Sequence, residues 1–312
     1  MVHDTTRDEK HLLGYDEERV LVLSELWHND SNTLLNQLLN TPTFIWIGNP
    51  ASFLTNGKTT SDSCSVNLQN PNQNPYEIVP VKQGMKYRLR LVGANTLFAL
   101  YFSIPNHQMT VVEVEGTLVK PIKVDQVEIL PGQRISVIIE ANQRPDNYYM
   151  QQVGKWRSAP PLNGFSILHY ESAPPPSNAA QHTLLPVANE TVGWINDKLE
   201  PLPTDTTESL PLEQPSETII LKGKQIKYGP NGTQRRWTLN DIVYELPSSS
   251  SLLEMSRNNQ LDSLPVQQKP SFTFKKDQIV DIVFQNTVTL NGICEVHPYQ
   301  YFLIIFSKTN RL

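Results

Sequence analysis

Met85-Lys-Tyr-Arg-Leu-Arg-Leu-Val92 is the stretch that decides the fold, because apolar and charged residues alternate along it. Successive side chains of a β-strand point to opposite faces of the sheet, so a period of two predicts a strand with one apolar and one charged face. The apolar residues expected to face a core are Tyr87, Leu89 and Leu91. The charged residues expected to face solvent are Lys86, Arg88 and Arg90.

The same alternation recurs in 108–116, 132–140 and 164–170. The stretch 19–26 is apolar on both faces at its centre and predicts a strand buried on both sides. The chain has 24 prolines and 14 glycines, which favours many short turns over long helices. Short strands at regular spacing, separated by turn residues, predict an all-β sandwich fold.

A proline-rich segment at 171–177 has the composition of a stiff, extended linker. It separates a first unit with dense strand signals from a second unit with sparser ones. The expected organisation is a leader at 1–17, a first sandwich at 18–172, a linker at 173–183 and a second, incomplete sandwich at 184–312. The polar stretch 245–270 is expected to be a long loop.

Composition excludes several classes of protein. At 312 residues the chain is long enough for two domains, each with its own core. Its net charge of -5 and the lack of a basic stripe argue against a nucleic-acid partner. The first ten residues are too polar for a signal peptide, and no apolar run is long enough for a membrane span, so we expect no membrane partner.

The two cysteines, Cys64 and Cys294, are too few for a disulfide framework. They form one bridge or none, and the sequence does not decide between these. Three Asn-x-Ser/Thr triplets are candidate N-glycosylation sites and weakly indicate a secreted ancestor. They start at Asn29, Asn189 and Asn231.

Several motifs, in order along the chain, resemble the multicopper oxidase family, and its ascorbate oxidase branch more than its laccases. Those similar to the middle domain of ascorbate oxidases are 23–28, 44–50, 53–57, 87–91, 106–116 and 132–139. Those similar to the third domain are 236–240 and 291–298. The resemblance covers roughly residues 16–300.

This resemblance implies tandem cupredoxin (plastocyanin-like) Greek-key β-sandwiches, of which the second is incomplete here. It implies copper as the cofactor of the intact family. There, a type 1 copper in the third domain takes electrons from a small-molecule reductant such as ascorbate or a phenol. A trinuclear cluster between the first and third domains reduces oxygen to water. The resemblance also implies a secreted, extracellular location.

One position matches a copper ligand of the family by the same resemblance. The stretch 297–302 is similar to the start of the signature His-Pro-x-His-x-His-Gly-His, and His297 matches a type 1 ligand. Gln300 and Phe302 stand where the next two histidines are expected. Copper needs several imidazole or thiolate ligands that converge on it. His297 is therefore expected to be an orphaned ligand position, that is, one without the further ligands needed to bind copper. We therefore expect no catalytic residue, no bound copper and no oxidase activity in the chain as written.

The other candidate residues are expected to have structural roles. We expect His28 in a core or an interface, His107 in a structural position and His169 in packing or at the surface. Glu113 and Glu115 alternate on one strand face and are interpreted as solvated. No Ser-His-Asp arrangement or glycine-rich phosphate loop is apparent.

The chain is interpreted as a fragment of an oxidase, but two other interpretations stay open. In one, the chain is a non-catalytic cupredoxin pair that serves as a binding or scaffold module. In the other, missing domains come from a separate chain or from self-association. For the tail 300–312, the hypotheses are translated intron sequence after Tyr299, or a genuine substitution and truncation.

Overall fold

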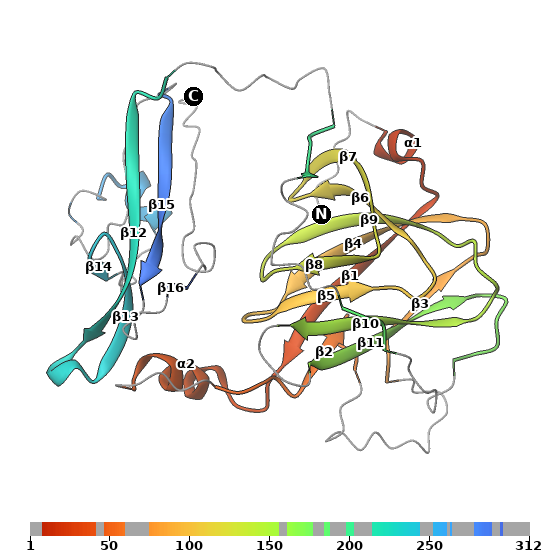
Figure 1. Ribbon diagram of the computed structural model, residues 1–312, viewed down its shortest axis with the longest axis horizontal. Coiled ribbons are helices and arrows are strands. Elements are labelled where there is room, and N and C mark those ends of the chain that lie inside the picture. The colour runs from red at the N-terminus through yellow and green to blue at the C-terminus, as the bar shows by residue number, and fades with distance from the viewer. Residues whose placement is uncertain are drawn as a thin grey trace. The chain divides into compact units, whose positions relative to one another are not determined.

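The computed structural model describes residues 8–41, 47–59, 75–155, 161–176, 184–187, 198–202, 214–243, 252–260, 263, 278–288 and 294–295 (Figure 1). Contacts between residues divide the chain into two compact units. One comprises 1–28 with 48–207, and the other comprises 29–47 with 208–312. The segment 29–47, expected within the first sandwich, is thus grouped with the second unit.

The first unit is a β-sandwich of two sheets, as the alternating sequence predicts. The first sheet has the order β2 (Ser52–Thr55), β1 (Glu17–Leu26), β4 (Lys86–Ala94), β9 (Arg134–Glu140), β6 (Met109–Val114) and β7 (Thr117–Val124). The second has the order β3 (Ile78–Val81), β11 (Leu162–Tyr170), β10 (Asn147–Lys155), β5 (Ala99–Ser103) and β8 (Gln126–Ile129). The pairs β1–β4 and β3–β11 are parallel, and the other pairs in both sheets are antiparallel.

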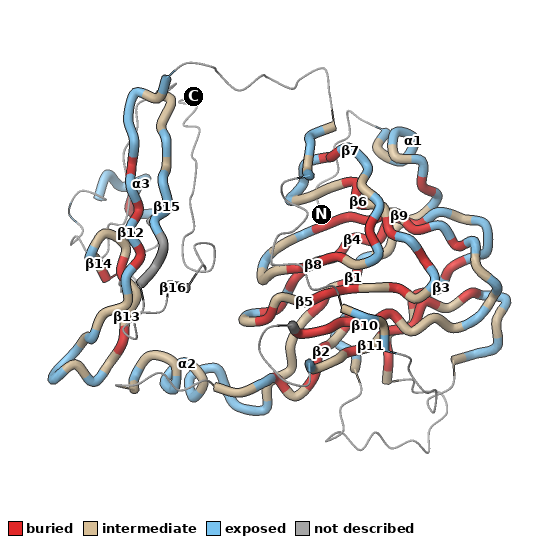
Figure 2. Tube along the Cα trace, in the orientation of Figure 1, coloured by how far each residue is buried: buried red, intermediate tan, exposed pale blue. Residues whose placement is uncertain are grey.

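The core lies between these sheets, where buried residues follow the strands of both (Figure 2). The apolar face expected for 85–92 is confirmed, since Tyr87, Leu89 and Leu91 are all 0% exposed. Close packing also dictates a glycine at 164: a Cβ there would lie 2.7 Å from the Cβ of Phe53, nearer than real Cβ atoms approach. Burial of large apolar side chains between the two sheets is the main stabilising contribution to the fold.

Strand β1 differs from its prediction, which was burial on both faces. Leu21 and Leu23 are 1% and 0% exposed, but Val20 is 43% exposed and Val22 is half-buried. The strand therefore has one buried face. Its apolar run alone could not distinguish one covered face from two.

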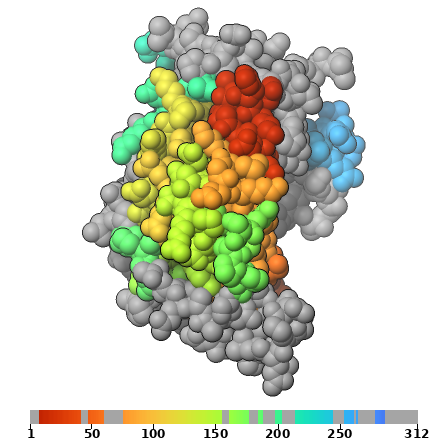
Figure 3. All heavy atoms as spheres, turned by 90° about the vertical axis from the view of Figure 1, so that its right-hand side faces the viewer, coloured from red at the N-terminus to blue at the C-terminus, as the bar shows by residue number. Residues whose placement is uncertain are grey.

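The described residues of the expected leader, 8–17, are an ordered part of the first unit. Residues Glu9–Leu13 form helix α1, with the Asp8 side chain as its N-cap and Gly14, at φ 67°, as its C-cap. Asp16 then pairs with Lys86 of β4 through two hydrogen bonds of 2.8 Å. In Figure 3 the red N-terminal segment accordingly lies on the surface of this unit beside orange residues of the next strands.

The second unit contains a further sheet with the order β14 (Ile242–Val243), β13 (Gln234–Leu239), β12 (Glu217–Tyr228), β15 (Val280–Val288) and β16 (Cys294–Glu295). The helical segments described in it are α2 (Ser31–Leu39), α3 (Leu252–Arg257) and the short η2 (Pro230–Gly232). Helix α3 lies in the stretch 245–270 that was expected to be a loop. Among the described residues, both units are built mainly of strands, which confirms the all-β class.

Helix α2 joins this unit through an arginine on β13. Arg235 is 2% exposed, and its Nη2 donates to the Leu38 carbonyl at 2.7 Å. Its Nε donates to the Thr41 carbonyl at 3.1 Å. The last carbonyls of a helix have no partners within the helix, so a guanidinium at this end satisfies them. This contact explains why 29–47 groups with the second unit.

Candidate functional site

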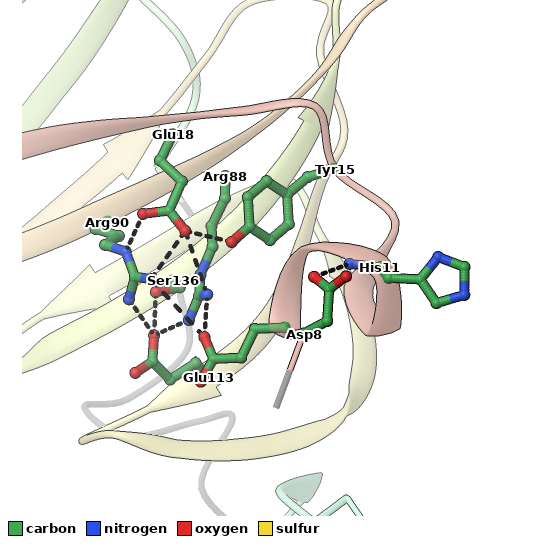
Figure 4. Close-up of polar contacts among 9 residues, drawn as sticks. Asp8, His11, Tyr15, Glu18, Arg88, Arg90, Glu113 and Ser136 are labelled. Carbon is green, nitrogen blue, oxygen red and sulfur yellow. Dashed lines mark hydrogen bonds and ion pairs between the residues drawn. The ribbon is translucent and has the colours of Figure 1, made fainter. Parts of the chain in front are cut away.

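A cluster of ion pairs lies on the face of β4 opposite the core (Figure 4). Strand register creates it. Glu113 on β6 is opposite Ser136 on β9, and Ser136 is opposite Arg90 on β4. Glu18 on β1 is level with Arg88 on β4. Residues two apart on a strand share a face, so both arginines meet carboxylates on either side.

The arginines bind these carboxylates through short ion pairs. Arg88 places Nη1 2.6 Å from Glu9 Oε2 and Nη2 2.6 Å from Glu113 Oε2. Arg90 binds Glu18 with two donors, Nε at 2.8 Å and Nη2 at 2.9 Å. Such paired, charge-assisted hydrogen bonds are stronger than neutral ones.

Two hydroxyl groups complete the cluster. Ser136 donates to Glu113, and Tyr15 donates to Glu18. The Tyr15 ring also lies 5.6 Å from the Arg88 guanidinium carbon, a cation–π contact. Tyr15 belongs to the N-terminal segment, so this segment covers Arg88 with both an aromatic ring and the Glu9 carboxylate.

The environment of the cluster favours the charged forms of Glu18 and Arg88. Burial would raise the pKa of Glu18, but hydrogen bonds from Arg90 and Tyr15 and the charges of both arginines outweigh it and lower that pKa to about 2. Burial would lower the pKa of Arg88, but hydrogen bonds with Glu9, Tyr15 and Glu113 raise it. A carboxylate held ionised in this way is a poor general acid at neutral pH. The arrangement fits anchoring of residues 8–18 to the sheet better than catalysis.

The burial of this cluster differs from the expectation that Arg88, Arg90 and Glu113 face solvent, which was wrong. Arg88 is 0% and Arg90 is 9% exposed, and the Glu113 side chain is 17% exposed. Alternation identified the correct face, but it could not show that the N-terminal segment covers it. The available signal was the match between two arginines on one strand and the acidic residues at 8–9 and 16–18. Glu115 is exposed, as expected, and pairs with Arg134 at 2.6 Å.

A second carboxylate, Glu25 at the end of β1, organises a loop. One of its oxygens accepts the backbone N–H groups of Leu97 at 3.2 Å and Phe98 at 2.9 Å. The other accepts Trp27 Nε1 at 3.0 Å and Thr96 Oγ1 at 2.7 Å. The carboxylate thus accepts four hydrogen bonds. Those from residues 96–98 hold the loop between β4 and β5 against the end of β1. Sequence alone gave no indication of this contact.

The described histidines lie on different elements and have different environments. His107 is buried, with Nδ1 2.7 Å from the Pro105 carbonyl and Nε2 2.8 Å from the Tyr170 hydroxyl. His169 is half-buried, with Nδ1 2.7 Å from Asn147 Oδ1. His28 is exposed, so it does not lie in the core, and the alternative of an interface position stays a prediction. It follows the end of β1 in the sequence.

Several predicted site residues lie outside the described part of the chain. These are Cys64, Asn189, His297, Gln300 and Phe302. Cys294 begins β16, where its Cα pairs with that of Val288. Two glycosylation candidates are exposed: Asn29 precedes α2, and Asn231 lies at the tip of the β12–β13 hairpin with φ 58°. Both assignments stay predictions.

A family model for multicopper oxidases matches residues 17–173, from the start of β1 to just beyond β11. The chain belongs to the multicopper oxidase family. The matched range is nearly the whole sandwich of the first unit, and it confirms the resemblance drawn from the sequence motifs.

Named relatives come from both branches of this family. Laccase-4 of Thanatephorus cucumeris is 31% identical over 277 residues, which cover 83% of this chain and 48% of the relative. An L-ascorbate oxidase of Cucurbita maxima is 25% identical, with 96% of this chain and 57% of the relative covered. The chain spans about half the length of these multicopper oxidase relatives.

Solved multicopper oxidases share the fold. Fet3p, a multicopper oxidase that functions in iron import, has a TM-score of 0.62 at 22% identity, covering 88% of this chain and 48% of that one. A laccase from Botrytis aclada has a TM-score of 0.60 at 24% identity, with the same coverage. The cupredoxin-like β-sandwich expected from the motifs is therefore confirmed.

The described residues do not fit a copper centre of this multicopper oxidase. Within the described ranges, no group of three or more His, Cys, Asp or Glu side chains is arranged to hold a metal ion. A blue copper site needs the imidazoles of two histidines and the thiolate of a cysteine around one copper ion. No reaction step through copper follows from the geometry. Also among the described residues, no helix is long and apolar enough to cross a membrane.

Proposed function

We propose that these 312 residues correspond to the middle domain and part of the last domain of a multicopper oxidase of the ascorbate oxidase and laccase type. In the intact protein, copper-dependent oxidation of a small reductant would be coupled to reduction of oxygen to water. The family match across the first unit supports this proposal, as do relatives aligned with up to 96% of the chain.

The polypeptide as written is proposed to be inactive on its own. The observation that carries this proposal is the placement of its histidines. Both ring nitrogens of His107 are hydrogen-bonded, one to Pro105 and one to Tyr170, and Nδ1 of His169 is hydrogen-bonded to Asn147. His11 and His28 are exposed on other elements. These four imidazoles do not converge, as copper ligands must.

The sequence around the type 1 position supports the same proposal. Gln300 and Phe302 follow His297 where the family signature has histidines. A phenylalanine has no donor atom, and a glutamine amide is a weak, hard ligand for copper. We therefore propose that His297 is an orphaned ligand position and that this polypeptide holds no copper centre.

The first unit is proposed to act as a rigid structural domain in the intact enzyme. Its ion-pair cluster fixes the segment before β1 to the sheet, and Glu25 fixes the loop after β4. The family resemblance further favours an extracellular location. There, Asn29, Asn189 and Asn231 would be available for N-glycosylation.

Oxygen uptake tests this proposal. The purified chain is incubated with copper, desalted and supplied with ascorbate or a phenol, beside a full-length ascorbate oxidase treated identically. The expected result is no uptake above the buffer rate by the chain and rapid uptake by the control. Sustained, enzyme-dependent oxygen uptake by the chain would overturn the proposed inactivity.

A further inference from the structure

His107, Tyr148 and Tyr170 form a compact group at one end of the second sheet of the first unit. His107 lies between β5 and β6, Tyr148 is on β10, and Tyr170 ends β11. Their ring centroids are 4.8 Å apart for His107 and Tyr148, 5.9 Å for His107 and Tyr170, and 5.6 Å for the two tyrosines. This group has no part in the ion-pair cluster.

The hydrogen bonds fix where the protons are. A carbonyl oxygen can only accept, so the 2.7 Å contact with Pro105 requires the proton of His107 on Nδ1. In the neutral imidazole, Nε2 is then an acceptor. The Tyr170 hydroxyl, 2.8 Å away, therefore donates its proton to Nε2. The backbone N–H of Gln143 donates to the Tyr170 oxygen at 3.1 Å, which leaves that proton directed at His107.

The surroundings hold both partners neutral before any reaction. Burial lowers the pKa of His107, against the opposing effect of its bond to Pro105. Burial also raises the pKa of Tyr170, partly opposed by the Gln143 bond. Tyr170 is 0% exposed and His107 is 5% exposed. A neutral phenol hydrogen-bonded to a neutral base is the arrangement from which a tyrosine loses an electron and a proton together.

We propose that Tyr170 and His107 form a proton-coupled one-electron donor. An outer-sphere one-electron oxidant at the surface removes one electron from Tyr170. In the same step the O–H bond of Tyr170 breaks and an N–H bond forms at His107 Nε2. The products are a neutral tyrosyl radical, an imidazolium and the oxidant reduced by one electron. An electron from a reductant, with return of the proton from Nε2, restores the pair.

Tyr148 connects this pair with the surface. It is half-buried, its ring contacts both His107 and Tyr170, and its hydroxyl donates to the Arg144 carbonyl at 2.7 Å. Arg144 and Asp146, whose charges act on the Tyr148 hydroxyl, are both exposed. An oxidant that docks over Tyr148 is thus separated from Tyr170 by one aromatic ring. This pair of residues requires no copper site and is independent of the function proposed above.

Tyr87 provides a matched control within the same unit. It is also 0% exposed, but its hydroxyl accepts from the Lys82 N–H at 2.8 Å and contacts the Met85 sulfur at 3.6 Å. Neither neighbour is a base that can take a proton at neutral pH. Loss of an electron from Tyr87 therefore lacks the assistance that His107 gives to Tyr170.

The test uses a ruthenium polypyridyl photo-oxidant chosen so that it leaves N-acetyl-tyrosinamide unoxidised at the same pH. With the full chain, transient absorption and electron paramagnetic resonance should detect a tyrosyl radical that forms more slowly in heavy water. The signal should be lost in Tyr170→Phe and in His107→Gln, which keeps an acceptor but removes the base. It should persist in Tyr87→Phe. A signal that survives in either of the first two variants would overturn the proposal.

A second measurement uses only the wild-type chain, so its result does not depend on whether a variant folds. In the wild-type chain with isotope-labelled histidine, pulsed resonance should detect coupling between the radical and an imidazole nitrogen. No radical at all, or a radical without this coupling, would equally overturn the proposal.

Discussion

Arg88 Nη2 on β4 lies 2.6 Å from Glu113 Oε2 on β6, although β9 separates the two strands in the sheet. The guanidinium reaches across β9 on the sheet face away from the core. There the N-terminal segment covers it, which leaves the Arg88 side chain 0% exposed. A buried cation of this kind is tolerated only because carboxylates surround it.

Arg88→Ala should destabilise the first unit strongly, because Glu9 and Glu113 would keep their charges without this partner. Removing one partner of a buried ion pair costs about 3–5 kcal/mol. Urea unfolding followed by near-ultraviolet circular dichroism would measure the loss. Arg134→Ala is the matched control, since its pair with Glu115 is exposed and such pairs contribute about 1 kcal/mol or less. Equal losses in the two variants would contradict the cluster as described.

Glu9→Gln should loosen the N-terminal segment while the sandwich stays folded. The change removes the ion pair to Arg88, and α1 has no buried residue to hold it by packing. Amide hydrogen exchange should accelerate at Leu12 and Gly14, whose N–H groups close this helix. Glu115→Gln, at an exposed pair, serves as the control and should leave that exchange unchanged. Unaltered protection of α1 in Glu9→Gln would show that the ion pair does not anchor it.

The stability of the first unit should fall in acid through Glu18. Its folded pKa of about 2 lies below the usual value of 4.5, so its contribution is complete above pH 4.5 and is lost as the pH falls toward about 2. Glu18→Gln should therefore flatten the decline in unfolding free energy across that window. Denaturant midpoints collected at several pH values would measure it. A decline of the same steepness in the variant would refute the assignment.

Gly154→Ala on β10 should destabilise the sandwich, because the new Cβ would lie 2.5 Å from the Phe53 Cζ atom, which leucine lacks. Overpacking of a closely packed core costs about 1–3 kcal/mol. A double-mutant cycle with Phe53→Leu, followed by thermal unfolding, checks the cause. The alanine should cost less when Leu occupies position 53, and strictly additive effects would rule out the steric explanation.

The sequence predicted the parts of the fold that depend on one strand at a time. The period of two in 85–92 placed Tyr87, Leu89 and Leu91 in the core. The same pattern could not show what covers the opposite face, because that depends on a segment about seventy residues away in sequence. The burial of Arg88 was missed for this reason. Long-range pairing, not local propensity, decides such positions.

The candidate site was predictable only in part. The family resemblance followed from ordered motifs, and the match over 17–173 confirms it. The roles of Glu25 and of the His107–Tyr170 pair were not predictable, because loops and strand ends bring their partners together. A core position for His28 was suggested by the apolar strand before it, but the side chain is exposed.

Copper stoichiometry tests the central claim most directly. The purified 312-residue chain is loaded with copper, freed of loosely bound ions by chelation and gel filtration, and examined by elemental analysis and visible absorption. We predict no stoichiometric copper and no blue band, because the described imidazoles do not converge and because, by the proposed match to the family signature, Gln300 and Phe302 stand where histidines are expected. One or more retained copper ions per chain, with an intense blue absorption, would contradict the account.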